Sequence, residues 1–412
     1  MYFYKEQNRR YASFEKLPLP KSEPSDSGPL TWLYTRPMAE SRASFAPTVP
    51  QQLLSATEDV RWLDPRRMEH CRMHLPENVQ RRLLGGTLRA VNAAHPRWRE
   101  IAASPVTRGK KRVHILALGD VGSTILMAFK LQGGDAISAI GICDVNEKAL
   151  ERWEFEMNQV TYPWEYDRLP PVEIVPREAI FRCDVFCFVA SRGIPPVGSA
   201  VEDVRMAQFA ANRELVEDFA RQARQDGFRG LFAVISDPVD PLAKAALLAS
   251  NCDENGQYDG LGLLPEQIQG FGLGVMNARA AYYARQEERF TSFLQEGRAF
   301  GPHGKGLVIA NSIEHYDDAL SRELTALALG ANLKMRELGF KPYAAPALSS
   351  AALSLLLTME GAWHYSSVFL GGVYLGVKNR FTPYGVETET LPLPDALFQR
   401  LQETERELHS II

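Results

Sequence analysis

The sequence predicts an α/β fold with a doubly wound parallel sheet, followed by a mixed α+β part and preceded by a helical or irregular extension. Three observations lead to this fold class. Short apolar runs alternate with amphipathic helical stretches between residues 111 and 258, which is typical of a parallel sheet covered on both faces. Beyond residue 258 the chain has long helical stretches and a hairpin-like pair of apolar runs. Residues 1–110 differ from both parts in charge.

The N-terminal extension, residues 1–110, carries 18 Lys and Arg against 11 Asp and Glu, whereas the rest of the chain carries 28 against 39. Its first half is rich in proline and serine, so we expect irregular or extended chain there. Residues 75–104 have apolar side chains at helical spacing, so helices are expected. The basic face of this extension can pack on the acidic remainder, pack on a second subunit or face water, and water is the default.

The strands and helices of the central part are predicted from the spacing of its apolar residues. Strands are expected within four apolar runs, and helices between them. The strand runs are residues 111–122, 136–144, 183–191 and 230–240, and the clearest helical stretches are 123–134 and 204–227.

The last part, from residue 259, is predicted to be mixed α+β. Residues 316–339 and 344–363 have helical spacing, residues 366–379 are typical of a hairpin, and residues 392–412 form an amphipathic final helix.

Composition limits the kinds of partner. The 412 residues are 45% hydrophobic and 23% charged, with a net charge of −4, which gives no reason to expect nucleic acid or a membrane surface. The five cysteines form no CxxC pair, so we expect free thiols in a reducing compartment and no metal site. No apolar run suits a signal peptide or a membrane span, and the expected location is the cytoplasm.

A cofactor motif follows the first expected strand. Gly119 and Gly122 stand in the turn between that strand and a helix, where glycines let backbone approach a pyrophosphate and a helix pack close to a strand. Asp144 ends the second strand, 22 residues beyond Gly122, which is the place of a ribose-binding acid. This Rossmann-type arrangement predicts NAD, since a carboxylate repels the 2′-phosphate of NADP. Ala117 replaces the first glycine of the motif and is tolerable only with a negative φ.

Four further motifs come in a fixed order. Arg205 and Asn212 are seven residues apart, S-D-P-V-D spans residues 236–240, M-N-A-R spans 276–279 and G-P-H-G spans 301–304. With the glycine turn, this order resembles the lactate/malate dehydrogenase family over residues 111–412. The resemblance divides the chain into the extension (1–110), an NAD-binding domain (111–258) and a C-terminal substrate domain (259–412).

The resemblance implies hydride transfer between NAD and a 2-oxo or 2-hydroxy acid. It implies that Arg279 holds the substrate carboxylate, Arg205 polarises the carbonyl group and His303 gives or takes the proton. Either arginine taken alone is more often a solvated helix residue; together with His303 we favour the functional interpretation. A homodimer or homotetramer is also implied. The residues expected at the cofactor are Gly119, Asp120, Val121, Gly122, Asp144, Ala190, Ser191 and Asp237.

Departures from the family pattern affect the expected substrate site. Met276 stands where the family has the aspartate that orients the histidine, and Asp237 replaces an asparagine. The loop from Ala190 to Arg205 is longer than the family's usual span, so the sequence does not separate lactate-type from malate-type substrates. Arg192 in this loop can recognise a second carboxylate, whereas Glu202 or Asp203 would favour a cationic group.

Residues 344–346, Ala-Ala-Pro, suggest a roomier pocket that admits a bulky 2-oxo acid. Two functions therefore stay open. The first is an NAD-dependent 2-hydroxyacid dehydrogenase, and the second is a catalytically silent NAD-binding sensor or interaction protein.

Overall fold

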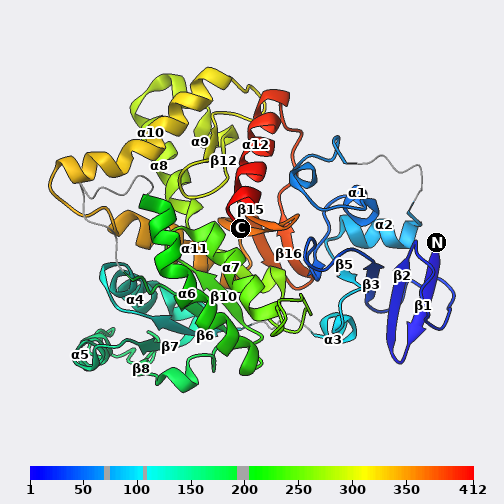
Figure 1. Cartoon of the computed structure of the whole chain (residues 1–412), viewed down its shortest axis with the longest axis horizontal. Helices are drawn as coiled ribbons and strands as arrows, with labels where there is room; N and C mark the ends of the chain where they lie inside the picture. Colours follow the sequence, from blue (N-terminus) through cyan, green and yellow to red (C-terminus); the bar gives the residue numbers. More distant parts are fainter. Residues whose placement is uncertain (69–74, 105–108, 193–203) are drawn as a thin grey trace.

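A computed structural model describes residues 1–68, 75–104, 109–192 and 204–412, without the side chains of residues 204–207. It has the expected α/β fold, arranged around a nine-stranded sheet in the order β16-β15-β14-β11-β10-β9-β6-β7-β8 (Figure 1). The six strands from β8 to β11 are parallel, and β14 joins them antiparallel. The parallel strands are β6 (Lys111–Leu116), β7 (Ile137–Cys143), β8 (Val172–Ile174), β9 (Val185–Phe188), β10 (Leu231–Val234) and β11 (Ile268–Gly270).

Helices cover both faces of the parallel part, as the side chains of β9 show. Phe186 and Phe188 belong to the core formed with α6 and α7, whereas Val185 and Cys187 belong to the core formed with α4 and α11. Alternate residues of a strand point to opposite faces, so this continuous apolar run is buried on both sides. The helices are α4 (Asp120–Gln132), α5 (Glu147–Asn158), α6 (Val204–Gln225), α7 (Val239–Asn251) and α11 (Leu353–Glu360).

The C-terminal part contains the expected hairpin and final helix. β14 (His364–Leu370) pairs antiparallel with β15 (Val373–Thr382), which pairs with β16 (Gly385–Thr388). A small two-stranded sheet, β12 (Arg298–Phe300) with β13 (Val308–Ala310), holds the loop that contains His303. The remaining elements are α8 (Leu273–Gln286), α9 (Phe293–Glu296), α10 (Asp318–Glu337), a π-helix at Pro346–Ala352 and α12 (Asp395–Ile411).

The N-terminal extension contains a five-stranded sheet that the sequence analysis did not expect. Its order is β1-β2-β3-β5-β4, and β5 lies in the stretch expected to be only helical. Parallel pairing of β3 with β2 and β5 joins segments distant in sequence, so neighbouring residues carry little signal for it. The elements are β1 (Tyr2–Glu6), β2 (Arg9–Ser13), β3 (Leu30–Tyr34), β4 (Ser44–Phe45), β5 (Arg89–Asn92), α1 (Pro50–Leu54), α2 (Glu77–Leu84) and α3 (Trp98–Ala103).

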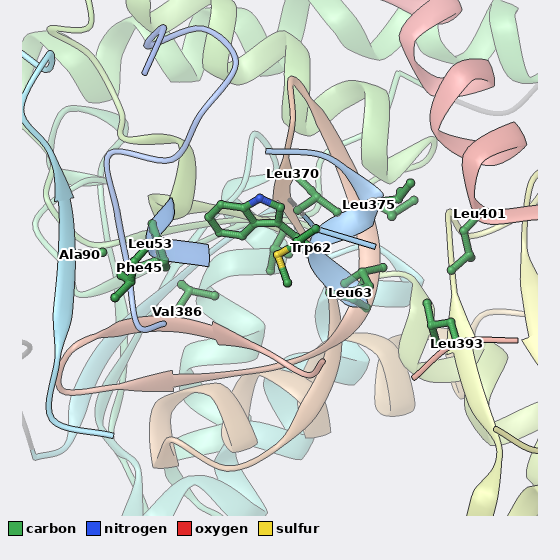
Figure 2. Close-up of a cluster of buried hydrophobic side chains, with 14 of the residues drawn as sticks. Phe45, Leu53, Trp62, Leu63, Ala90, Leu370, Leu375, Val386, Leu393 and Leu401 are labelled. Carbon is green, nitrogen blue, oxygen red and sulfur yellow. The ribbon is translucent and has the colours of Figure 1, made fainter. Parts of the chain in front are cut away.

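This extension shares a hydrophobic core with the C-terminal strands. Figure 2 shows Trp62 with side chains from both parts of the chain. The backbone N–H of Ala46 donates to the carbonyl oxygen of Val386 at 3.0 Å. Burial of this much apolar surface makes the extension part of the folded body. The labelled residues are Phe45, Leu53, Trp62, Leu63 and Ala90 from the extension, and Leu370, Leu375, Val386, Leu393 and Leu401 from the C-terminal part.

Polar contacts reinforce that packing. The buried carboxylate of Glu266 accepts hydrogen bonds from the Ala43 N–H at 3.0 Å and the Ser44 hydroxyl at 2.7 Å. Burial raises the pKa of Glu266, and these hydrogen bonds oppose the rise. Arg97 donates to the carbonyl oxygen of Gly262 at 2.6 Å. Part of the basic extension therefore packs on the remainder of the chain, and the boundaries at residues 110 and 258 stay predictions.

Candidate active site

The glycine turn lies between β6 and α4, at the carboxyl edge of the parallel sheet. A Cβ atom on Gly122 would lie 1.9 Å from the carbonyl oxygen of Ala117, so only glycine fits this close approach of helix to strand. A Cβ on Gly119 would meet nothing within 4 Å. Gly119 thus leaves open space directly before the first turn of α4, where unpaired N–H groups favour an anion. These residues fit a dinucleotide pyrophosphate.

Ala117 corrects one expectation. Its φ is +75°, in the left-handed region, and not negative as the sequence analysis required. The strand and turn explain this conformation: the Ala117 N–H donates to the Cys143 carbonyl oxygen at 2.8 Å, while its own carbonyl group turns toward Gly122. The turn therefore keeps a glycine-like geometry, with strain of about 1 kcal/mol at the alanine.

Asp144 and Asp120 flank this turn. The Asp144 carboxylate accepts the Leu118 N–H at 2.6 Å and the Asn146 N–H at 2.9 Å, so it ties the end of β7 to the turn. Asp120, at the first position of α4, forms an ion pair with Lys341 at 3.0 Å. That pairing offsets a negative charge at the helix end where a phosphate would bind. Val121, also expected at the cofactor, lies in this first turn and is half-buried.

The segments after β9 and β10 meet at the same edge. The Ser236 hydroxyl donates to the Ala190 carbonyl oxygen at 2.6 Å. The buried Asn212 side chain accepts the Arg192 N–H and donates to the Asp237 carbonyl oxygen, both at 2.9 Å. Residues expected at the cofactor therefore follow adjacent parallel strands, which is where ligands bind in open α/β sheets. Ser191 lies between these contacts and is exposed.

His303 lies close to Asp237. Its Nδ1 atom is 3.8 Å from the Asp237 Oδ1 atom, and the side chain is mostly buried. A Cβ on Gly272 would come within 2.7 Å of the His303 Cβ, so the start of α8 packs directly against the ring. The His303 N–H donates to the buried carboxylate of Asp240.

The loop around His303 is fixed mainly by backbone contacts. Gly301, with φ +86°, donates its N–H to the Gly376 carbonyl oxygen of β15 at 2.9 Å. Asp240 also accepts the Ser367 hydroxyl. Burial raises the pKa of Asp240 to about 6 against the lowering effect of these hydrogen bonds. The glycine-bounded loop is therefore held at Gly301 and at His303.

Arg279 lies on α8 and turns toward α10. Its guanidinium group donates to the Asn332 side-chain oxygen and, at 3.4 Å, to the Ala328 carbonyl oxygen. Burial lowers the pKa of Arg279, and the charges of Tyr283 and Asp237 act in the opposite direction. The charge of Asp237 therefore acts on Arg279, and its carboxylate lies beside His303.

Some expected residues lie outside the described part of the chain. Arg205 lies in the first turn of α6, and its side chain is outside the described residues, as are Glu202 and Asp203. Arg192 is exposed and pairs with Glu214 at 2.6 Å, so it faces α6 in this structure.

Three residues of the site were not anticipated, namely Lys341, Asn332 and Ser367. Each contacts a partner more than 50 positions away in sequence, and none belongs to a motif. Asp240, which accepts the Ser367 hydroxyl, does belong to a motif, the S-D-P-V-D segment.

Comparisons with known proteins concern the sequence and the fold of the chain. No family model matches the chain. The L-lactate dehydrogenase of Treponema denticola is 28% identical over 195 residues, covering 47% of this chain and 55% of that protein. The L-lactate dehydrogenase of Mesomycoplasma hyopneumoniae (strain 232) is 21% identical over 203 residues, covering 49% of this chain and 58% of its own length. The chain thus spans little more than half the length of these curated relatives.

Solved structures share the fold over a larger part of the chain. The minor L-lactate dehydrogenase of Enterococcus mundtii superimposes with a TM-score of 0.58 and 18% identity, covering 73% of this chain and 97% of that chain. Malate dehydrogenase from Archaeoglobus fulgidus, solved in complex with NADH, gives 0.57 and 15% identity, covering 73% of this chain and 98% of that chain. Residues 111–412 make up the same share of this chain.

The fold and the glycine turn define a Rossmann-type α/β protein, and solved lactate and malate dehydrogenases share this fold. The sequence matches are L-lactate dehydrogenases and the structural neighbours are lactate and malate dehydrogenases, so the chain is similar to that family.

Proposed function

We propose that the chain is an NAD-dependent oxidoreductase that interconverts a 2-hydroxy acid and a 2-oxo acid. One observation carries the proposal: the His303 ring lies 3.8 Å from the Asp237 carboxylate, and Asp237 follows β10, whose carboxyl end lies on the same sheet edge as the glycine turn. A proton donor and a carboxylate-binding cation beside a dinucleotide site are what this reaction needs.

In the cofactor half, backbone groups of the glycine turn and one carboxylate, that of Asp144, would bind NAD. Gly119 leaves room for the pyrophosphate at the N-terminus of α4, and the Asp144 carboxylate would accept ribose hydroxyl groups. Its negative charge favours NAD over NADP. A bound nicotinamide supplies or accepts the hydride.

The substrate half would act through two arginines and the histidine. Arg279 would bind the substrate carboxylate by two parallel hydrogen bonds, exchanging its contact with Asn332 for the substrate. Arg205 would polarise the carbonyl group. In reduction, a hydride adds to the carbonyl carbon and His303 gives its proton to the oxygen; in oxidation, His303 takes that proton back.

The test is turnover of 2-oxo acids with NADH. Purified full-length protein is mixed with NADH and a panel of small and bulky 2-oxo acids, and the loss of NADH absorbance is followed. We expect turnover of at least one acid, and bulky ones to be accepted because residues 344–346 are small. NADH binding without any turnover would reject the dehydrogenase proposal.

The rival function, a catalytically silent NAD-binding protein, is favoured by the contact of Arg279 with Asn332 and by Met276 in place of an acid. The variant His303→Asn separates the two. If the chain is an enzyme, kcat should fall by roughly 10²–10⁴-fold, the usual contribution of a general acid, while calorimetry gives an unchanged Kd for NADH. Equal rates in the variant and the wild type would contradict the role of His303.

The partners and location complete the proposal. We expect a small-molecule acid as substrate, a homodimer or homotetramer, and residence in the cytoplasm. No helix in the described ranges has the length and apolar character needed to cross a membrane. Light scattering on the purified protein would measure the oligomeric state.

A further inference from the structure

The imidazole of His303 has a carboxylate beside it that the sequence motifs do not assign to it. We propose that Asp237 is the positioning residue of His303, orienting its ring and stabilising its protonated form; this inference rests on the proposed dehydrogenase function. The two side chains are 3.8 Å apart between Nδ1 and Oδ1. That distance is an ion-pair distance, and such contacts commonly tighten when substrate binds.

The backbone sets the relative position of the two side chains. Asp237 lies two residues before Val239, the first residue of α7. Asp240, in the first turn of α7, accepts the His303 N–H. One short segment, residues 237–240, therefore contacts both the backbone and the ring of His303. Gly272 packs directly against the same residue, because a Cβ atom there would lie 2.7 Å from the His303 Cβ and 3.2 Å from its Nδ1. The backbone of Asp237 is thus fixed near the ring by Asn212 and α7, and its side chain is 49% exposed.

Other charged groups in this region are already engaged. The Asp240 carboxylate on α7 accepts hydrogen bonds from the Ser367 hydroxyl and the His303 N–H. Arg279 on α8 donates to α10. Lys305, two residues beyond His303, lies 3.6 Å from Glu407 of α12. Within the described part of the chain, the Asp237 carboxylate lies at ion-pair distance from the ring.

The residue on α8 that faces this region cannot take the same role. Met276 lies one helical turn after Gly272, is buried, and contacts the Arg279 guanidinium through its sulfur at 3.6 Å. A thioether does not stabilise an imidazolium ion. A carboxylate at Nδ1 does, and it leaves the remote ring nitrogen to exchange the proton with the substrate oxygen.

The experiment compares Asp237→Asn with the wild type in the full chain. Asparagine keeps the shape and removes the charge, and it is also the residue that the family pattern has at this position. If Asp237 only contacts the cofactor, Asp237→Asn should be neutral. If it positions His303, kcat for 2-oxo acid reduction should fall by about 10- to 100-fold with KM for NADH little changed, and the high-pH limb of the rate profile should move to lower pH.

Two further variants sharpen this test. Glu254→Gln, which removes an exposed carboxylate remote from the site, should match the wild type. Asp237→Asn combined with Met276→Asp, which moves the acid to the α8 side, should regain part of the lost kcat, at least about fivefold. Wild-type kcat in Asp237→Asn would overturn the inference.

A readout independent of turnover is NMR titration of His303 without substrate. Removing the adjacent anion should lower the pKa of His303 by about half a unit or more. A lowered value in Asp237→Asn without any turnover in the wild type would support the pair and reject the dehydrogenase function. An unchanged value in an active enzyme would reject the pair alone.

Discussion

The glycine turn and the histidine loop are built differently. In the glycine turn, the Ala117 N–H donates to the Cys143 carbonyl oxygen and the Leu118 N–H donates to the Asp144 carboxylate, and these bonds join the ends of two adjacent parallel strands. The histidine loop is held by α7, α8 and β15, which come from separate parts of the chain. The first region depends on one strand-turn-helix unit, whereas the second depends on the packing of the whole C-terminal part. The departures from the family pattern are most consequential in the second region.

The comparison predicts that a change in the substrate half leaves cofactor binding intact. Arg279→Met should raise KM for the 2-oxo acid by roughly 10- to 100-fold, because a charge-assisted hydrogen bond to the carboxylate contributes about 1.5–3 kcal/mol. Steady-state kinetics measures this effect. Arg285→Met, on the exposed side of the same helix, is the control. Equal KM values for both variants would show that Arg279 does not bind substrate.

A change in the cofactor half should instead weaken the binding of the cofactor. Asp144→Ala should weaken NADH binding about tenfold, because it removes the expected ribose acceptor and leaves the Leu118 N–H without its carboxylate partner. Calorimetric titration with NADH and NADPH would also show a smaller preference for NADH. Glu151→Ala, an exposed acid on α5, should bind both as the wild type does. An unaltered Kd in Asp144→Ala would remove Asp144 from the site.

The smallest expected effect tests the turn itself. Ala117→Gly should increase the free energy of unfolding by about 1 kcal/mol, since glycine adopts a φ of +75° without strain. Urea denaturation monitored by fluorescence measures it. Ala128→Gly, within α4, should instead destabilise the protein by a similar amount. Destabilisation by both glycines would mean that Ala117 is not strained.

The cofactor half could be predicted from the sequence because its signals are local. Gly119, Gly122 and Asp144 lie within one strand-helix-strand unit, and the structure gathers them at one edge of the sheet. The hairpin at residues 366–379 has the same local character. The φ of Ala117 was wrongly expected to be negative, because the turn geometry outweighs the preference of one alanine.

The sequence by itself determined the α/β class, four of the six parallel strands (β6, β7, β9 and β10), the C-terminal hairpin and the identity of the motif residues. Apolar period and turn residues act between near neighbours, and these features depend on them. Only the tertiary structure decided that the extension forms a sheet sharing a core with β15 and β16, that Arg279 meets Asn332, and that Asp237 lies beside His303. These contacts join segments more than 50 residues apart, and only packing in three dimensions brings them together.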